Sequence, residues 1–185
     1  MLNNLGNLQY QKNELDDALK SYQEALGIRR ELVRLHPQGD SSDLAGTLNN
    51  LAALQFDKGE FDDAAKSYRE ALETYRNLAQ SNPQDYLTDI AGALNAMGDL
   101  QYKKDEFEDA RKLYGESLEI RRGLARSNPQ AYLPDVAVTL NNLGNVQSDK
   151  GEYEDALKSY RESLGISREL ARSNPQGYLS VVAAT

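Results

Sequence analysis

Asparagine recurs in this sequence at an interval of 46 residues. One series occupies Asn3, Asn49, Asn95 and Asn141. Four residues after these positions stand Asn7, Ala53, Asp99 and Asn145. Side chains four residues apart share one face of a helix, and a primary amide carries both a donor and an acceptor. Amides stacked along one surface could therefore bond to the C=O and N–H groups of a peptide backbone whatever its sequence.

Further polar and aromatic side chains accompany these asparagines. A second asparagine directly follows the first at Asn4, Asn50 and Asn142, with Ala96 in the third copy. Seven residues after the first asparagine, on the same helical face, come Tyr10, Phe56 and Tyr102, with Ser148 in the fourth copy. We expect these rings to supply apolar pockets. The residues expected to add charge specificity are Asp57, Asp99 and Asp149.

No set of residues for catalysis or metal binding can be assembled from the sequence. His36 is the single histidine, and it precedes Pro37, where we expect it to end a helix. There is no cysteine, no Ser/His/Asp set and no phosphate-binding glycine loop. Paired carboxylates such as Asp16 and Asp17 stand where helices are expected to begin, and the helix dipole is sufficient reason for them. We therefore expect no enzyme activity, no cofactor and no metal.

The composition limits the class of partner. With 21 basic and 29 acidic side chains, the chain has a net charge of −8 and no Lys/Arg-rich run. Such a surface is poorly suited to nucleic acid or to an anionic membrane. The longest apolar runs are a few residues, far below the roughly 20 that span a bilayer. No signal peptide opens the sequence, so we expect a cytoplasmic protein.

The 46-residue interval extends over the whole sequence and indicates an array of repeats. It separates the prolines Pro37, Pro83, Pro129 and Pro175. It also separates the leucines Leu2, Leu48, Leu94 and Leu140. A fixed period of this length with helical patterning inside each copy is typical of stacked modules. The expected repeats are approximately 1–41, 42–87, 88–133 and 134–179, with a partial fifth helix at 180–185.

Each repeat is expected to contain two helices. The first set, here called the A helices, is predicted at 2–12, 42–57, 88–103 and 134–149. The second set, the B helices, is predicted at 15–35, 61–81, 107–127 and 153–173. Polar turns at Asn13, Gly59, Asp105 and Gly151 separate the two, because these residue types tolerate the left-handed conformation. In the second B helix, Ala64, Tyr68 and Leu72 belong to one apolar stripe with a 3.6-residue period.

The starts of the A helices and the ends of the array carry further expectations. Asp43, Asp89 and Asp135 are predicted in first helical turns, and Pro134 at a first helical position. Tyr86-Leu87, Tyr132-Leu133 and Tyr178-Leu179 are predicted as corner connectors between repeats. The first copy has Asp40-Ser41 instead, so its corner should be the least firmly held. The array lacks a polar capping helix, which suggests a fragment of a longer array whose ends could stack head to tail.

The individual repeats resemble the tetratricopeptide repeat. Residues 47–72 read TLNNLAALQFDKGEFDDAAKSYREAL. The family's large apolar, small and turn positions are matched by Leu48, Leu51, Ala52, Gly59, Phe61, Ala64, Tyr68, Ala71 and Leu72. The period exceeds the family's usual 34 residues and is similar to the longer repeats of kinesin light chain and of prokaryotic arrays. One departure is glutamine at Gln9, Gln55, Gln101 and Gln147, where the family usually has an aromatic residue.

The resemblance implies an all-α fold, a right-handed α-solenoid of stacked antiparallel helix pairs with a 46-residue repeat. It also implies that the A helices line a concave groove where partners bind. The peptide-binding residues would then be Asn3, Asn7, Asn49, Asn50, Asn95, Asp99, Asn141, Asn142, Asn145, Tyr10, Phe56 and Tyr102. Two other roles for the asparagines stay open, namely bonds between neighbouring helices and simple solvation of the groove.

Charge on the A helices narrows the expected partner. Tetratricopeptide domains that clamp a C-terminal carboxylate use basic residues on these helices. Here lysines stand only at the helix ends, at Lys12, Lys58, Lys103, Lys104 and Lys150. A neutral to acidic groove suits an extended protein or peptide segment that is neutral or basic. The alternative function is a structural spacer, or a self-assembling array with head-to-tail contacts.

Overall fold

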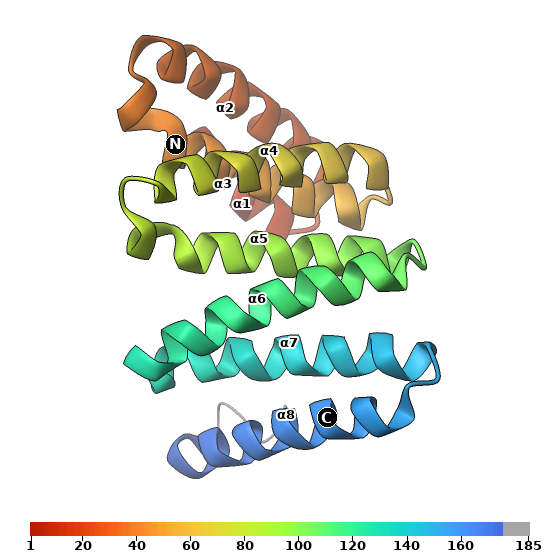
Figure 1. Ribbon diagram of the computed structural model, residues 1–185. Helices are drawn as coiled ribbons and strands as arrows, with labels where there is room; N and C mark the ends of the chain where they lie inside the picture. The colour runs from red at the N-terminus through yellow and green to blue at the C-terminus, as the bar shows by residue number, and fades with distance from the viewer. Residues whose placement is uncertain (176–185) are drawn as a thin grey trace. The chain divides into compact units, whose positions relative to one another are not determined.

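The computed structural model describes residues 1–175, apart from the side chains of residues 37–39 and 173. Over this range the chain forms α-helices joined by short turns (Figure 1). The A helices are α1 (Leu2–Gln11), α3 (Pro37–Asp57), α5 (Pro83–Lys103) and α7 (Pro129–Asp149). The B helices are α2 (Leu15–Leu35), α4 (Phe61–Ala79), α6 (Phe107–Ser127) and α8 (Tyr153–Ser173). The partial helix predicted at 180–185 lies outside the described residues.

The B helices and the turns before them are confirmed. Three B helices have the predicted bounds, and α4 ends two residues early, at Ala79. The four turn residues have positive φ angles: Asn13 62°, Gly59 77°, Asp105 59° and Gly151 76°. Each turn is closed by a backbone hydrogen bond such as Glu60 N–H to Gln55 C=O, 2.8 Å. His36 ends α2, as expected from the proline that follows it.

The predicted start of the first A helix, at residue 2, is confirmed, whereas the predicted starts of the other three are wrong by five residues. α3, α5 and α7 begin at their prolines, so Tyr132-Leu133 lies within a helix and forms no connector. Proline suits a first helical position because its φ is preset, and the preceding Asn128 is extended, with φ −142°. Pro134 is consequently inside α7. Asp43, Asp89 and Asp135 likewise lie beyond the first turns.

Burial accompanies the early start of α7. Tyr132 and Leu133 pack against a cluster made of Leu118, Ala125, Val136 and Leu140. A helical start places both side chains on this cluster, where they are partly buried. Full burial of one large apolar side chain contributes roughly 1.5–3 kcal/mol, so each of the two contributes less than that. Proline inside a helix costs about 3 kcal/mol, because it lacks the N–H and its ring clashes with the carbonyl four residues before, so both side chains together are needed to offset Pro134. Tertiary packing therefore overrides the local signal at residue 134.

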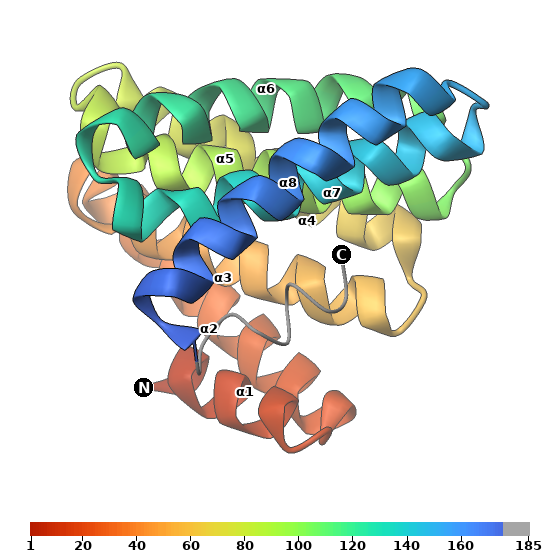
Figure 2. The ribbon, with the colours of Figure 1, turned by 90° about the horizontal axis from the view of Figure 1, so that it is seen from below.

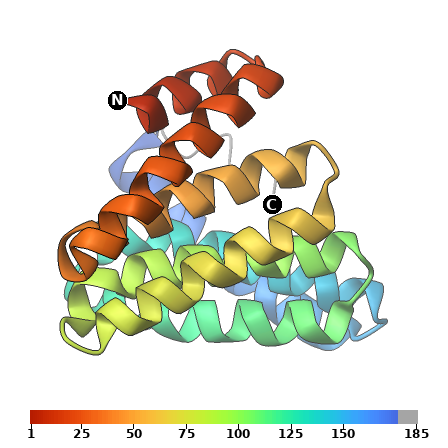
Figure 3. The same ribbon diagram turned by 90° about the horizontal axis from the view of Figure 1, so that it is seen from above.

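The chain divides into two compact units, Met1–Ala96 and Met97 onward, and the division falls inside α5. In the first unit, consecutive helices pack against each other and α1 also contacts α3 (Figure 3). In the second unit, α7 packs against both α6 and α8 (Figure 2). The predicted stripe residues Ala64, Tyr68 and Leu72 are buried, which confirms the all-α packing of antiparallel pairs. No described helix is long and apolar enough to cross a membrane.

Candidate functional site

In the first unit, the A helices carry a pocket that contains several of the predicted binding residues. Its volume is about 250 Å³. It is lined by Asn7, Tyr10, Gln11, Tyr22, Asn50 and Ala53. Asn7, Tyr10 and Asn50 were predicted to bind peptide, and they come from two neighbouring A helices, α1 and α3. The structure therefore brings together side chains that are about 40 residues apart in sequence.

Amides of neighbouring A helices bond directly to each other at this pocket. The Nδ2 group of Asn50 donates to Oδ1 of Asn7 at 3.1 Å and to Oδ1 of Asn3 at 3.4 Å. The Tyr22 hydroxyl on α2 donates to the same Oδ1 of Asn7 at 2.8 Å. The Asn7 oxygen thus joins three helices, and the amide planes of Asn7 and Asn50 are held in fixed orientations.

The second unit repeats this arrangement. Nδ2 of Asn142 donates to Oδ1 of Asp99 at 3.0 Å, and the Tyr114 hydroxyl donates to the same oxygen at 2.6 Å. In the last repeat, the Tyr160 hydroxyl donates to Oδ1 of Asn145 at 2.7 Å. The residue four positions after the first asparagine is therefore an acceptor for a B-helix tyrosine in both units.

The first asparagines of each repeat differ from their neighbours. Oδ1 of Asn49 is buried and, within the part of the chain that the structure describes, has no hydrogen-bond partner. Asn95 is also buried, at 9% exposure, while Asn3 and Asn141 are half-buried. The amides of Asn50 and Asn142 donate to the A helix that precedes their own, where Asn3, Asn7 and Asp99 accept.

The predicted aromatic residues form contacts at the ends of the A helices. The Tyr10 hydroxyl donates to Asp57, and that of Tyr102 donates to Oδ2 of Asp149 at 2.6 Å. Burial and the bond to Asp57 raise the pKa of Tyr10 to about 12. The bond to Asp149, together with burial, likewise raises the pKa of Tyr102 to about 12. Both hydroxyls therefore stay protonated and hold exposed carboxylates in place at neutral pH.

Phe56 and Tyr102 also pack against the helix that follows. The ring centroid of Phe56 is 5.7 Å from that of Phe61, and that of Tyr102 is 5.8 Å from that of Phe107. Of the three predicted rings, Tyr10 is the one that lines the pocket. The other two contact the first residue of the B helix that follows them.

The sequence prediction missed the B-helix tyrosines Tyr22, Tyr114 and Tyr160. A signal for them exists, because each lies 15 residues after an Asn or Asp that directly follows glycine. A Cβ added at Gly98 would lie 2.6 Å from Cε1 of Tyr114, and the same closeness recurs at Gly6 and Gly144. The glycine makes room for the ring, and the following residue accepts its hydroxyl.

The glutamines that depart from the family pattern are also explained by a B-helix partner. Ser21, Ser67 and Ser159 donate to Gln9, Gln55 and Gln147 at 2.7, 2.8 and 2.8 Å. In the third repeat Leu113 replaces the serine, and Gln101 instead bonds to Glu106. A polar pair thus stands where the family usually buries an aromatic ring.

The lysines at the ends of the A helices are paired with acids. Lys58 lies 2.7 Å from Asp16, and Lys150 lies 2.7 Å from Glu152 and also contacts Glu108. These pairs raise the pKa of Lys58 and of Lys150. Within the described residues, no group of three or more acidic or histidine side chains could hold a metal ion. The residues that line the pocket are uncharged, and Asp57 adds a negative charge beside it through its bond with Tyr10.

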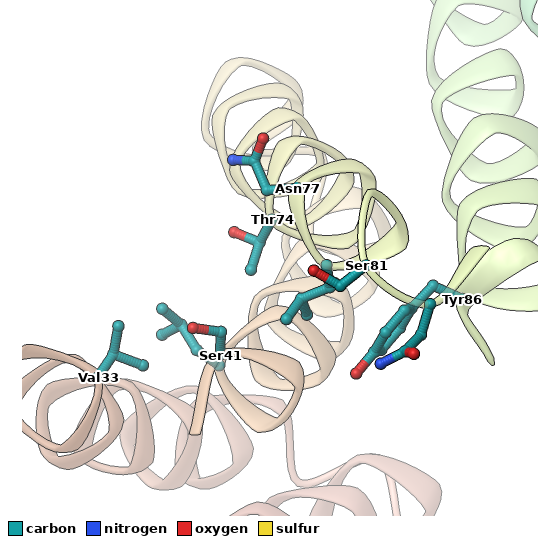
Figure 4. Close-up of a pocket in the computed structure, with 9 residues that line it drawn as sticks. Val33, Ser41, Thr74, Asn77, Ser81 and Tyr86 are labelled. Carbon is teal, nitrogen blue, oxygen red and sulfur yellow. The ribbon is translucent and has the colours of Figure 1, made fainter. Parts of the chain in front are cut away.

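A second hollow lies at the other end of the helices of the first unit. Its volume is about 440 Å³ (Figure 4). Val33 and Ser41 lie on one side, and Thr74, Asn77 and Ser81 come from α4 and the turn after it. In the second unit, Leu133 and Ile166 occupy the positions of Ser41 and Thr74, and the corresponding hollow is about 380 Å³. Replacement of Tyr-Leu by Asp40-Ser41 therefore makes this hollow more polar in the first unit.

Buried tyrosine hydroxyls should make the fold sensitive to alkali. Tyr75 is 5% exposed, and burial together with the negative charge of Asp89 raises its pKa from 10.0 to about 12. The contribution of Tyr75 to the free energy of unfolding is complete below pH 10. It is lost as the pH rises toward 12, because in that window the tyrosine ionises only in the unfolded chain. We expect Tyr75→Phe to reduce the fall in the free energy of unfolding between pH 9 and 12 by about 1–2 kcal/mol. Urea titrations at several pH values in this range measure the free energy of unfolding. An equal fall with pH for the wild-type and Tyr75→Phe proteins would contradict the expectation.

Comparisons with known proteins agree with this geometry. Family models described as tetratricopeptide repeat match residues 1–37, 43–123 and 89–169. The crystal structure of BtubC (BKLC) from P. vanneervenii is similar, with a TM-score of 0.78 and 26% sequence identity. That match covers 91% of this chain and 63% of BtubC, so this chain spans less than two thirds of that protein. A comparison with curated proteins found no match. The chain therefore belongs to the tetratricopeptide repeat family, as its repeats indicated.

Proposed function

We propose that the A-helix face of this chain binds an extended peptide segment of neutral to basic character. Tetratricopeptide repeats generally mediate protein–protein interaction and form a non-catalytic scaffold, which supports a binding role. The observation that carries the proposal is the pocket of about 250 Å³ between α1 and α3. Three residues expected to bind peptide, Asn7, Tyr10 and Asn50, line it together.

The amides of the pocket suit a peptide backbone. Asn50 uses its N–H groups on Asn3 and Asn7, so its carbonyl oxygen is the group that accepts a peptide N–H. Because Tyr22 holds Asn7 in place, little side-chain entropy is lost on binding. Each hydrogen bond contributes roughly 0.5–1.5 kcal/mol, so a few such contacts correspond to a dissociation constant on the order of micromolar.

Charge supports a neutral or basic segment over an acidic one. Asp57 and Asp149 are exposed at the ends of A helices, each held by a tyrosine hydroxyl. Lys58 and Lys150 are already paired with acids, and the whole chain has a net charge of −8. An acidic peptide would be repelled by this surface. Binding of a basic peptide should weaken as salt screens the carboxylates.

Filling the pocket tests the proposal without disturbing its hydrogen bonds. Ala53 lines the pocket and is half-buried, so Ala53→Leu should occupy the volume and keep the helix stable. We expect it to weaken binding of capped neutral and basic heptapeptides on an array by about tenfold or more. Ala53→Ser, which keeps the pocket open, is the matched control. Equal peptide capture by the Ala53→Leu and wild-type chains would remove this pocket from the mechanism.

A further inference from the structure

Asp57 is a carboxylate without a cationic partner in the part of the chain that the structure describes. It is the last residue of α3, it is exposed, and it accepts a hydrogen bond from the Tyr10 hydroxyl of α1. The lysine that follows it is already paired. Lys58 lies 2.7 Å from Asp16 and 3.6 Å from Glu60. The negative charge of Asp57 is therefore left for a ligand.

Tyr10 connects this carboxylate to the pocket between α1 and α3. The Tyr10 ring lines the pocket, and its hydroxyl donates to Oδ2 of Asp57. Tyr22 supplies a second ring, and the other lining residues are uncharged. Aromatic faces attract cations, and the methylene stem of a long basic side chain packs on such apolar surface. A basic side chain that enters the pocket along these rings thus meets a negative charge.

The bond from Tyr10 decides which cation the carboxylate suits. Tyr10 engages Oδ2 of Asp57, which leaves Oδ1 as the open oxygen. A guanidinium binds a carboxylate best as a fork, with parallel bonds to both oxygens, whereas an ammonium is a point charge that needs one oxygen. The tyrosine therefore competes with the second bond of an arginine and leaves the single bond of a lysine intact. The second unit repeats this device, since the Tyr102 hydroxyl donates to Oδ2 of Asp149 at 2.6 Å.

The hydrogen bond between Tyr10 and Asp57 is intact at neutral pH. Burial and this bond raise the pKa of Tyr10 to about 12, so the hydroxyl keeps its proton. Discrimination between ligands consequently depends on the charge and shape of the ligand side chain.

We propose that this pocket selects a lysine side chain, over arginine and over neutral residues, in the peptide bound by the A-helix face. The inference rests on the proposed function and adds to it the residue type that the pocket recognises. The lysine methylenes lie against the rings of Tyr10 and Tyr22, and the ammonium pairs with Oδ1 of Asp57. Acetylation of the lysine removes its charge and with it the preference.

Four capped heptapeptides that differ only at the central residue test this selectivity. In a Ser-Gly background the central residue is lysine, arginine, acetyl-lysine or norleucine, the last of which keeps an apolar stem without a charge. Fluorescence anisotropy with the full 185-residue chain measures each Kd. We expect the lysine peptide to bind roughly three- to tenfold more tightly than the acetyl-lysine and norleucine peptides, because one charge pair on an exposed carboxylate distinguishes them. Its advantage over the arginine peptide should be roughly two- to threefold.

Two substitutions separate the charge of the site from its geometry. Asp57→Asn removes the charge and keeps an oxygen for Tyr10, so the lysine and norleucine peptides should bind equally. Tyr10→Phe keeps the ring and frees Oδ2, so the arginine peptide should bind as tightly as the lysine peptide. The matched control is Asp85→Asn, an equal charge change at an exposed residue in the first turn of α5, which should preserve the wild-type preference. Far-UV circular dichroism of each variant checks that the fold is unchanged.

Three results would overturn the inference. Equal Kd values for the lysine and norleucine peptides would show that the wild-type pocket recognises no charge. A lysine preference that survives Asp57→Asn would place the cation site elsewhere, and a preference over arginine that survives Tyr10→Phe would remove the tyrosine from the selection. In each of these cases, weaker peptide binding by the Ala53→Leu chain would still support the proposed function. Absence of binding by all four peptides would overturn the proposed function and the inference together.

Discussion

Replacing Gly98 with alanine should lower the free energy of unfolding by about 1–3 kcal/mol, although alanine favours helices. The added Cβ would lie 2.6 Å and 2.7 Å from Cε1 and Cδ1 of Tyr114. That ring is 1% exposed, and its hydroxyl is held by Asp99 at 2.6 Å. The ring is therefore fixed at both ends and has no space to retreat into. Urea unfolding followed by circular dichroism measures the change.

A second glycine provides the control for this substitution. Gly123 lies in α6, and a Cβ there would have no atom within 4 Å. Gly123→Ala should raise the free energy of unfolding by about 0.5–1 kcal/mol, because alanine loses less backbone entropy on folding. Opposite signs at the two glycines would show that contact with Tyr114, and no general property of helical glycine, decides the result. Equal stabilisation at both positions would contradict the expectation.

The second repeat shows how alanine could be accommodated. It has Ala52-Ala53 where the third repeat has Gly98-Asp99, and Tyr68 occupies the place of Tyr114. Ala52 and Tyr68 are both buried, so a ring can lie beside alanine when the acidic acceptor is absent. Gly98→Ala should consequently cost less in an Asp99→Ala background. A double-mutant cycle should give a coupling free energy of about 0.5–3 kcal/mol.

Arg121→Ala should lower the free energy of unfolding by about 2–4 kcal/mol. The guanidinium is 9% exposed and donates to the Asp135 carbonyl at 3.0 Å and to Oγ1 of Thr139 at 2.5 Å. Burial lowers the pKa of Arg121, and the negative charges of Asp135 and Asp99 oppose that shift. Truncation would leave a cavity and remove a charged donor from buried oxygens. Chemical denaturation measures the loss.

The second repeat again contains the matched replacement. Arg29 of the first repeat contacts Thr47 of the second, as Arg121 of the third repeat contacts Thr139 of the fourth. At the equivalent positions stand Tyr75 of the second repeat and Ala93 of the third, both buried. Tyr75 packs against Tyr86 at a centroid distance of 6.3 Å, and Tyr132 is the equivalent of Tyr86 in the third repeat.

Arg121→Tyr combined with Thr139→Ala should therefore be more stable than the sum of the two single changes predicts. A coupling free energy of about 0.5–3 kcal/mol is expected, since the two positions touch. Strict additivity in denaturation experiments would mean that the arginine and threonine positions are independent. The alternation of Arg/Thr and Tyr/Ala pairs at these positions along the chain would then make no difference to stability.

Local sequence determined the repeat and most of its helices. The 46-residue period and the apolar stripe of each B helix are properties of neighbouring residues, as are the left-handed turns at Gly59 and Gly151. Their physical causes act within a few residues, so they could be predicted. The start of α7 could not, because burial of Tyr132 and Leu133 on a distant cluster outweighs the helix-start signal at Pro134.

The candidate site was predicted in its composition, whereas its contacts were decided by the tertiary structure. Adjacent asparagines such as Asn49 and Asn50 are chemically identical, but they point about 100° apart around a helix. Packing turned Asn50 toward Asn7 and buried the Asn49 oxygen without a partner in the described chain. Tyr22, which holds Asn7, comes from another helix. The order of residues therefore specifies which side chains the A helices carry, and the rotation of each helix against its neighbours specifies which of those side chains meet.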